Sequence, residues 1–346
     1  MAPEILAPRE PIQKGTTKMR SIKSLFSLLV ASGVALASLA ASANADDKVV
    51  RIGLQKSSTL ATVLRTNGEL EKRFAALGYK VTWSEFTSGL PLLEALNVGA
   101  IDLSADVADT VPIFAQAAGA KLTYVAQEAP SPTAQAILVP RDSPIKSVAD
   151  LKGKKVAVTK AAGAHFLLIA ALEKAGLKFS DVEPAYLTPA DGRAAFEKGA
   201  IDAWVVWDPF VSAAQKQANA RVLADGSDGV ANYQRYYLAS SAFAAKEPKV
   251  IEAYFDLLEG TGKWVKANPA EATKILAPAW KLEEDVVSSA NQRRSYQVRA
   301  LSPSDLNEQQ RIADTFFAEK LLPKAINATE AEIWSKDKKS TEAAPK

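Results

Sequence analysis

The sequence contains no cysteine and a single histidine, His165, among its 346 residues. Without cysteine there can be no disulfide, no thiolate nucleophile and no cysteine-based zinc site. A Ser-His-Asp triad would have to use His165, but the sequence has no Gly-x-Ser-x-Gly turn, no Walker loop and no dinucleotide-binding fingerprint. The sequence therefore gives no support to an enzyme, and it predicts neither a cofactor nor a metal site.

Basic residues do not outnumber acidic residues in the chain after residue 45. Residues 1–45 carry five basic and two acidic residues, and subtracting these from totals of 42 and 39 leaves 37 of each sign. Nucleic-acid binding requires a basic surface, so we expect no nucleic-acid partner.

An export signal precedes the predicted fold. Arg20 and Lys23 lead into an apolar stretch over 25–41, which ends at the small-residue cleavage pattern Ala43-Asn44-Ala45. A membrane anchor is the alternative, but the stretch is short and rich in alanine and serine. We predict a signal peptide at 19–45, a leader extension or mis-assigned start at 1–18, and a periplasmic protein.

A four-residue repeat organises the remaining chain. Gly99-Ala100-Ile101-Asp102 recurs as Gly199-Ala200-Ile201-Asp202. In each copy we expect a helix to end at the glycine, which tolerates the left-handed conformation, and a strand to begin at the isoleucine. Two copies of one helix–glycine–strand unit predict two α/β lobes with a ligand between them.

The apolar periodicity extends this alternation of strands and helices along the chain. Strands are expected at 49–54, 81–86, 101–105, 122–126, 134–139, 156–159, 182–187 and 201–206. Helices are expected from 58 or 59 to 77 and at 91–97, 111–118, 166–175, 192–198, 248–264, 269–276, 283–292 and 304–319. This order predicts an α/β fold with a parallel-dominated sheet flanked by helices in each lobe. We assign lobe 1 to 46–130, lobe 2 to 131–236, a return to lobe 1 to 237–335 and a loose tail to 336–346.

Ligands of such sheets bind beyond the carboxyl ends of the strands. Gln55, Lys56 and Ser57 follow the first strand and precede a helix, where free backbone N–H groups and the helix dipole favour an anion. The alternative is that Ser58 or Thr59 merely caps the helix.

Two further loops fit the same description in the second lobe. Gly163, Ala164 and His165 open a helix, and their small side chains let a ligand approach the backbone. Trp207 and Asp208 stand at the end of a strand, where an indole could flank an organic group. The alternatives are a surface or capping role for His165 and a core position for Trp207.

Asp109, Thr110 and Asp191 occupy equivalent edges. Because a carboxylate repels an anionic ligand, the two aspartates cap helices, bind a cationic group of the ligand, or pair with Lys56 or Lys160. The turn 225–229 is rich in Asp and Gly but lacks the spacing of a calcium loop.

Several segments of the chain are similar to one family of binding proteins. They are Arg51-Ile52-Gly53 with Gln55-Lys56, then 93–99, 113–120, 143–146, 148–153 and 186–191, and finally Trp207-Asp208-Pro209-Phe210. Together they resemble the aliphatic sulfonate-binding proteins of bacterial ABC importers, within the nitrate, sulfonate and taurine group. The chain departs from the family at Ser104-Ala105-Asp106 and at Ala161-Ala162-Gly163-Ala164, where fewer hydroxyl groups are present.

The resemblance implies a type II-like periplasmic binding protein, monomeric, with two lobes that close about a hinge of two crossings near 129–134 and 233–239. Its implied ligand is an alkanesulfonate, and its implied partner is the permease of an importer that supplies sulfur. Taurine, a sulfate ester or nitrate is the alternative ligand. An exported enzyme of pyrimidine-type cofactor synthesis is an alternative of another class, as is a structural or interaction protein.

Overall fold

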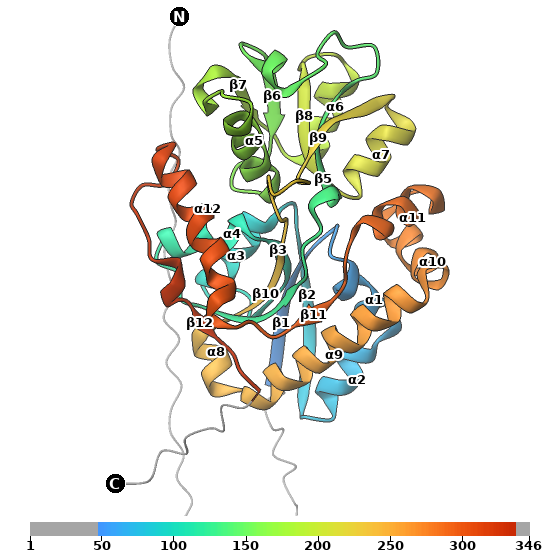
Figure 1. Cartoon of the computed structure of the whole chain (residues 1–346). Helices are drawn as coiled ribbons and strands as arrows, with labels where there is room; N and C mark the ends of the chain where they lie inside the picture. The colour runs from blue at the N-terminus through green and yellow to red at the C-terminus, as the bar shows by residue number, and fades with distance from the viewer. Residues whose placement is uncertain (1–47, 337–346) are drawn as a thin grey trace, which may run out of the picture. The chain divides into compact units, whose positions relative to one another are not determined.

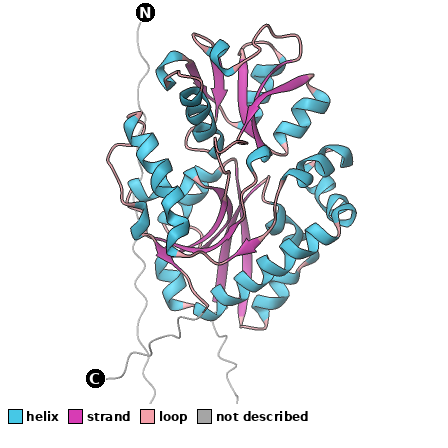
Figure 2. Ribbon diagram, in the orientation of Figure 1, coloured by secondary structure: helices cyan, strands magenta, loops and turns pink. Residues whose placement is uncertain are grey.

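The computed structural model describes residues 48–336, in which the chain forms two β-sheets covered by helices (Figure 1, Figure 2). The predicted segments 1–18 and 19–45, and all but the first residue of the predicted tail, lie outside the described residues. The first sheet has the order β11-β4-β10-β3-β1-β2, with β12 paired to β4. Its strands are β1 Lys48–Gln55, β2 Tyr79–Phe86, β3 Leu103–Ala108, β4 Leu122–Glu128, β10 Arg235–Ser240, β11 Val298–Arg299 and β12 Glu332–Ile333.

The second sheet has the order β7-β6-β8-β5-β9. Its strands are β5 Gln135–Pro140, β6 Lys155–Val158, β7 Glu183–Tyr186, β8 Ala203–Trp207 and β9 Ala220–Asp225. Strands β1, β2 and β3 are parallel, as are β6, β7 and β8, whereas β10 and β5 pair antiparallel with their neighbours. The predicted α/β class is confirmed, but both sheets are mixed rather than dominated by parallel strands.

Helices follow most strands and then dominate the last third of the described chain. They are α1 Thr59–Asn67, α2 Glu69–Ala75, α3 Gly89–Asn97, α4 Thr110–Ala117, α5 Gly163–Lys174, α6 Pro189–Glu197, α7 Phe210–Gln217, α8 Ser241–Lys246, α9 Pro248–Ala267, α10 Pro269–Trp280, α11 Glu284–Arg293 and α12 Leu306–Ala318. The helix predicted over 58–77 is two helices, because Gly68 adopts the left-handed conformation and ends α1. The apolar spacing continues through Gly68, which is why periodicity alone does not reveal the break.

The Gly-Ala-Ile-Asp repeat has the same structure in both sheets. Gly99 and Gly199 have φ of 73° and 67° and follow α3 and α6, as predicted. The strands begin two residues later than predicted, because each aspartate side chain instead accepts a backbone N–H of a neighbouring strand. Asp102 accepts the Arg51 N–H at 2.8 Å, and Asp202 accepts the Lys155 N–H at the same distance.

The chain crosses between the sheets twice, over 129–134 and over 226–234. The first crossing coincides with the predicted one. The second lies earlier than predicted, because residues 235–239 already belong to β10, where Arg235 pairs with Ala108 of β3. The lobe boundaries proposed from the sequence stay a prediction.

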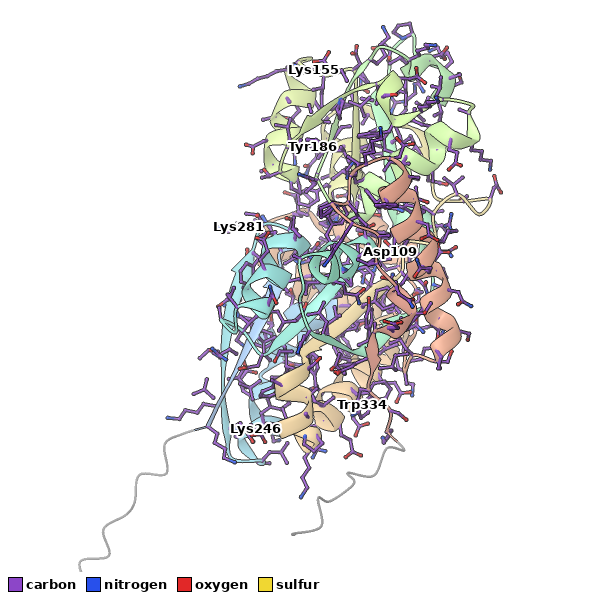
Figure 3. All side chains as sticks on the ribbon, turned by 90° about the vertical axis from the view of Figure 1, so that its left-hand side faces the viewer. Asp109, Lys155, Tyr186, Lys246, Lys281 and Trp334 are labelled. Atoms are coloured by element: carbon purple, nitrogen blue, oxygen red, sulfur yellow. The ribbon has the colours of Figure 1, made fainter. Side chains whose placement is uncertain are left out.

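Helix α5 is enclosed on all sides. Every residue from 163 to 172 is buried, which is typical of a helix packed between two layers rather than on a surface. One layer is the second sheet, since α5 contacts β5 and β8, and the other includes α4. In Figure 3, Lys155 at the start of β6 lies far from the first sheet and Tyr186 at the end of β7 lies nearer to it. The carboxyl ends of these parallel strands therefore face the first sheet.

Candidate functional site

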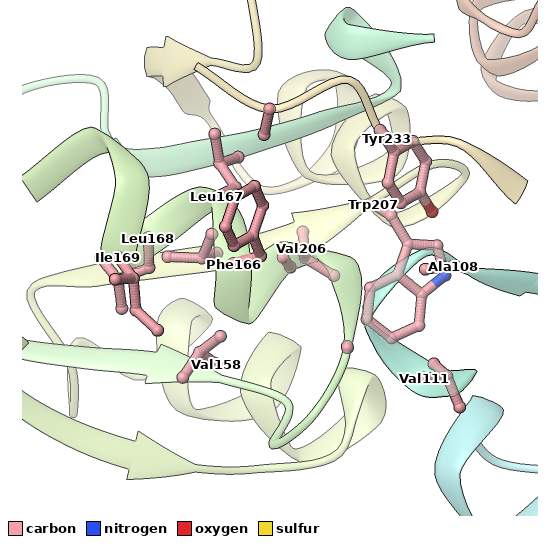
Figure 4. Packing of buried hydrophobic residues seen from close by; sticks show 14 of the residues in the cluster. Ala108, Val111, Val158, Phe166, Leu167, Leu168, Ile169, Val206, Trp207 and Tyr233 are labelled. Carbon is pink, nitrogen blue, oxygen red and sulfur yellow. The ribbon is translucent and has the colours of Figure 1, made fainter. Parts of the chain in front are cut away.

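Residues from the strand ends of the two sheets contact one another directly. Ser57 follows β1, and its hydroxyl accepts the indole N–H of Trp207, the last residue of β8, at 3.2 Å. Both side chains are buried. Figure 4 shows the Trp207 ring beside Tyr233 and above Val111. The structure thus brings two predicted site residues together across 150 positions of sequence.

A second contact joins the start of α5 to the first sheet. A Cβ atom on Gly163 would lie 2.9 Å from the Tyr233 ring and 3.0 Å from the Cβ of Ala108, at the end of β3. Real Cβ atoms are not found at such distances, so the position accepts only glycine without displacement of its neighbours. Ala164 is fully buried behind it. The backbone at the α5 start therefore packs directly against the Tyr233 ring and the Ala108 side chain.

The helices that open at these contacts have no side-chain cap, although the His165 N–H of α5 already donates to the Ala162 carbonyl oxygen at 2.9 Å. Among residues 48–336, no side chain caps α1 at Ser58 or α5 at Ala162. The Ser58 hydroxyl instead accepts the Gln55 N–H at 3.1 Å, and the Thr59 hydroxyl bonds that of Tyr296. The alternative that Ser58 or Thr59 merely caps α1 is therefore wrong. Initial helical N–H groups lack intrahelical acceptors, so both helix starts offer donors to an anion.

Gln55 lies at the same edge and is buried. Its side-chain amide donates to the backbone oxygen of Asp106 at 2.9 Å, which fixes the orientation of the amide group. One amide hydrogen and the amide oxygen remain for other partners.

His165 is a core residue rather than a surface residue. Its ring is fully buried among those of Phe179, Tyr186 and Phe316, with centroids 5.1–5.5 Å away. Burial, with a smaller effect of the Lys160 charge, lowers the pKa of His165 from 6.5 to about 3, so the ring is neutral. Its Nδ1 accepts the N–H of Ala161 at 3.3 Å, and Ala161 has a left-handed φ of 60°. His165 therefore supports the loop before α5 and does not itself point a cation at a ligand.

The two aspartates at the other helix starts differ in role, because Asp109 caps α4 whereas Asp191 bonds the residue that caps α6. Asp109 accepts the Thr110 N–H at 2.9 Å and the Gln234 N–H at 3.0 Å, and burial raises its pKa to about 7 (Figure 3). Asp191 is exposed, and it accepts the hydroxyl of Thr188, the residue that caps α6. Of the three predicted roles, helix capping is observed for Asp109, whereas α6 is capped by Thr188 rather than by Asp191.

Within residues 48–336, neither Lys56 nor Lys160 forms an ion pair with Asp109 or Asp191. The two lysines line different pockets. Lys56 is exposed in a pocket of about 370 Å³ with Arg65 and Glu85. Lys160 lines a largely apolar pocket of about 300 Å³ between α3 and α4. Lys56 is the chain neighbour of Ser57, but its exposed side chain lines the first of these pockets, and Asp191 is exposed at the start of α6.

Asp208 has a partner from a distant helix. Its buried carboxylate accepts the Ser212 N–H at 3.0 Å and pairs with Arg293, the last residue of α11, at 3.0 Å. Burial raises the pKa of Asp208, while the Arg293 charge opposes that rise.

A buried ionic network beneath Gln55 is absent from the sequence-based prediction. Arg294 pairs with Glu128 at 2.8 Å and with Asp106 at 3.3 Å, and Arg235 pairs with Asp106. Asp106 and Arg235 lie inside buried strands, and charged residues are rarely buried without a partner. A charged residue in an otherwise largely apolar strand, as at Asp106 and Arg235, is the sequence feature that could have indicated a buried ionic network.

Within residues 48–336, no cluster of three or more histidine, aspartate or glutamate side chains could hold a metal ion, and no helix is long and apolar enough to cross a membrane.

The chain is similar to known proteins over most of its length. Residues 74–272 match the family model described as NMT1/THI5 like. A relative from Escherichia coli (strain K12), named for binding aliphatic sulfonates, is 40% identical over 90% of this chain and 97% of its own.

Two solved structures share the fold as well as the sequence. The periplasmic aliphatic sulphonate-binding protein SsuA from Escherichia coli is 42% identical, with a TM-score of 0.75 over 83% of this chain and 97% of its own. The alkanesulfonate-binding protein SsuA from Xanthomonas axonopodis pv. citri, bound to MOPS, is 40% identical, with a TM-score of 0.76 over 80% of this chain and 95% of its own. The desulfurization enzyme DSZB is 16% identical with a TM-score of 0.60 over 81% of this chain, a likeness that shows the fold alone.

Proposed function

The chain belongs to the NMT1/THI5-like family, and we propose that it captures alkanesulfonates in the periplasm and delivers them to the permease of an ABC importer. The observation that carries the proposal is the 40% identity to an aliphatic sulfonate-binding relative across 90% of the chain. The proposed protein is a monomer exported by its signal peptide. Its two lobes close by a hinge motion about the crossings at 129–134 and 226–234.

The chemistry of the candidate site supports a sulfonate. A sulfonate is a permanent monoanion near neutral pH whose three oxygens accept hydrogen bonds and donate none. The uncapped starts of α1 and α5 supply N–H donors, and burial of a charge is tolerated only when such donors surround it. We propose that Gln55, Ser57 and the backbone at Gly163 and Ala164 contact the sulfonate, and that Trp207 contacts the organic group.

The placement of carboxylates favours a simple alkanesulfonate over taurine. Taurine adds an ammonium group, which calls for a carboxylate at the site. Asp109 is occupied by two backbone N–H groups, and Asp191 is exposed and accepts the Thr188 hydroxyl. Nitrate and sulfate esters would accept hydrogen bonds from the same donors as a sulfonate. Only a binding measurement can therefore distinguish these ligands from an alkanesulfonate.

We propose a binding protein rather than an enzyme, and the single histidine supports this view. Cofactor synthesis of the pyrimidine type would require a reactive histidine or cysteine beside a bound cofactor. The chain has no cysteine, and His165 is buried among aromatic rings, which lowers its pKa to about 3.

A thermal-shift screen of the purified protein tests the proposal. The panel contains alkanesulfonates of increasing length, taurine, sulfate, nitrate and a carboxylate of matched length. A ligand that binds the native state stabilises it by about 2.7 kcal/mol at a concentration of 100 Kd. We expect the melting temperature to rise with alkanesulfonates and not with the carboxylate. A flat response to every anion would contradict the proposal.

Substitution at Gln55 tests the location of the site. We expect Gln55→Ala to weaken sulfonate binding without unfolding the protein, because the backbone of β1 stays paired with β2 at this position. Wild-type affinity in this variant would exclude Gln55 from the site.

A further inference from the structure

Arg293, the last residue of α11, contacts the start of α7 and the loop before it. One of its guanidinium nitrogens, Nη1, contacts both carboxylate oxygens of Asp208, at 3.0 and 3.2 Å, and the Ser212 hydroxyl at 2.8 Å. The other, Nη2, donates to the Gln215 amide oxygen at 2.6 Å. The guanidinium therefore makes four polar contacts to the start and middle of α7.

These contacts join the helical layer of the first sheet to a strand end of the second. Helix α11 packs against α10, which contacts α1 and α9, whereas α7 follows β8 and contacts β5, β8 and β9. Asp208 is the residue directly after Trp207, whose indole donates to Ser57 of the first sheet. Arg293, at the end of α11, thus binds the residue next to Trp207 and restrains the loop in which Trp207 lies.

We propose that Arg293 is a positioning residue for ligand binding: by pairing with Asp208 it holds the loop of Trp207 against the loop of Ser57 and so favours the closed arrangement of the two lobes. This inference rests on the proposed function, because a ligand bound between the lobes selects the closed arrangement. The observed affinity of such a ligand is its intrinsic affinity multiplied by the closed fraction.

The local turn at Asp208 does not depend on Arg293. The carboxylate also accepts the Ser212 N–H at 3.0 Å and the Ser212 hydroxyl at 2.7 Å, both from the first turn of α7. Substitution of Arg293 therefore removes the ion pair between Asp208 and α11, while the two hydrogen bonds from Ser212 to Asp208 remain. It also leaves a buried carboxylate without its cation, which lowers stability independently of closure.

A second ion pair between the same helices provides a matched control. Lys216 of α7 pairs with Asp285 of α11 at 2.7 Å, but these side chains are 36% and 64% exposed. Exposed pairs are weak because water and salt screen them. If every charge pair between α7 and α11 contributed equally to closure, Lys216→Ala would weaken ligand binding as much as Arg293→Ala does.

The test measures the Kd of ethanesulfonate by calorimetry and the radius of gyration of the ligand-free protein by X-ray scattering. We expect Arg293→Ala to weaken binding at least tenfold and to enlarge the ligand-free protein, and Lys216→Ala to change the Kd less than twofold. Arg293→Lys should bind with intermediate affinity, because one ammonium cannot reach Asp208, Ser212 and Gln215 together.

The double variant Asp208→Asn/Arg293→Ala separates positioning from stability. It contains no buried unpaired charge, and the amide oxygen introduced at position 208 still accepts from Ser212, so its stability should recover while its affinity stays weak. Recovery of wild-type affinity, or an unchanged Kd and radius in Arg293→Ala, would overturn the inference. Failure of the wild-type protein to bind any sulfonate would overturn the proposed function, and the scattering comparison would still decide the role of Arg293 in closure.

Discussion

Removal of Arg294 is expected to destabilise the described fold strongly. Its guanidinium lies 2.8 Å from both carboxylate oxygens of Glu128 and 3.3 Å from the Asp106 carboxylate. Both carboxylates are completely buried, and the Arg294 side chain is 4% exposed. We choose Arg294→Met, which keeps most of the volume of the side chain and removes the charge.

The expected magnitude follows from the partners that remain. Glu128 would keep the hydroxyl of Tyr237 at 2.7 Å, and Asp106 would keep its ion pair with Arg235. One buried carboxylate would therefore lose its cation. Breaking a buried ion pair by removing one partner typically costs about 3–5 kcal/mol. This is a large part of a total free energy of unfolding of about 5–15 kcal/mol.

Urea unfolding followed by circular dichroism measures the change. The double variant Glu128→Gln/Arg294→Met is the control, because a neutral amide can still accept from Tyr237 without a buried charge. We expect it to recover at least half of the lost free energy. A loss below about 1 kcal/mol in Arg294→Met would refute the reasoning, as would a double variant no more stable than the single one.

Three further predictions concern the start of α5. Below its ordinary pKa of 6.5 the unfolded chain protonates His165, whereas the folded pKa is about 3. Titration of His165 therefore lowers the free energy of unfolding by about 2 kcal/mol at pH 5, whereas Asp109, with a folded pKa of about 7, has the opposite effect in wild type and variant alike. Relative to His165→Phe, the wild type should lose about 2 kcal/mol between pH 7 and pH 5 in urea unfolding. Gly163→Ala should weaken sulfonate binding in calorimetry because its methyl group meets the Tyr233 ring, whereas Gly260→Ala, with nothing within 4 Å, should be neutral or slightly stabilising. Ala162→Ser should cap α5, stabilise the protein by up to about 1 kcal/mol and weaken sulfonate binding, and unchanged affinity would contradict a role for the α5 donors.

Much of the fold is predictable because its signals are local. The glycines of the repeat end α3 and α6 through their own backbone preference, and the apolar spacing indicates most strands and helices. The two-residue delay of β3 and β8 is not predictable in this way. It depends on Asp102 and Asp202 bonding strands that lie about 50 residues earlier in the chain.

The candidate site was predictable in position but not in side-chain direction. Ser57, Gly163 and Trp207 could be placed because strand ends are recognisable in the sequence. The burial of His165 and the outward direction of Lys56 depend on tertiary packing. Arg294 was not predictable at all, since it lies 166 residues from Glu128 and no local pattern connects them.

The distribution of helix caps gives the candidate site a physical rationale. Among the described helices that follow parallel strands, α4 and α6 are capped by the side chains of Asp109 and Thr188. The starts of α1, α3, α5 and α7 have no such cap, although a cap typically adds about 1 kcal/mol. A side-chain cap occupies the N–H groups that an anion would use, so stability and binding compete for the same donors. Of these uncapped helices, α1 and α5 begin beside the contacts that join the two sheets at Ser57 and Gly163, where a bound anion could supply the acceptors that the chain itself omits.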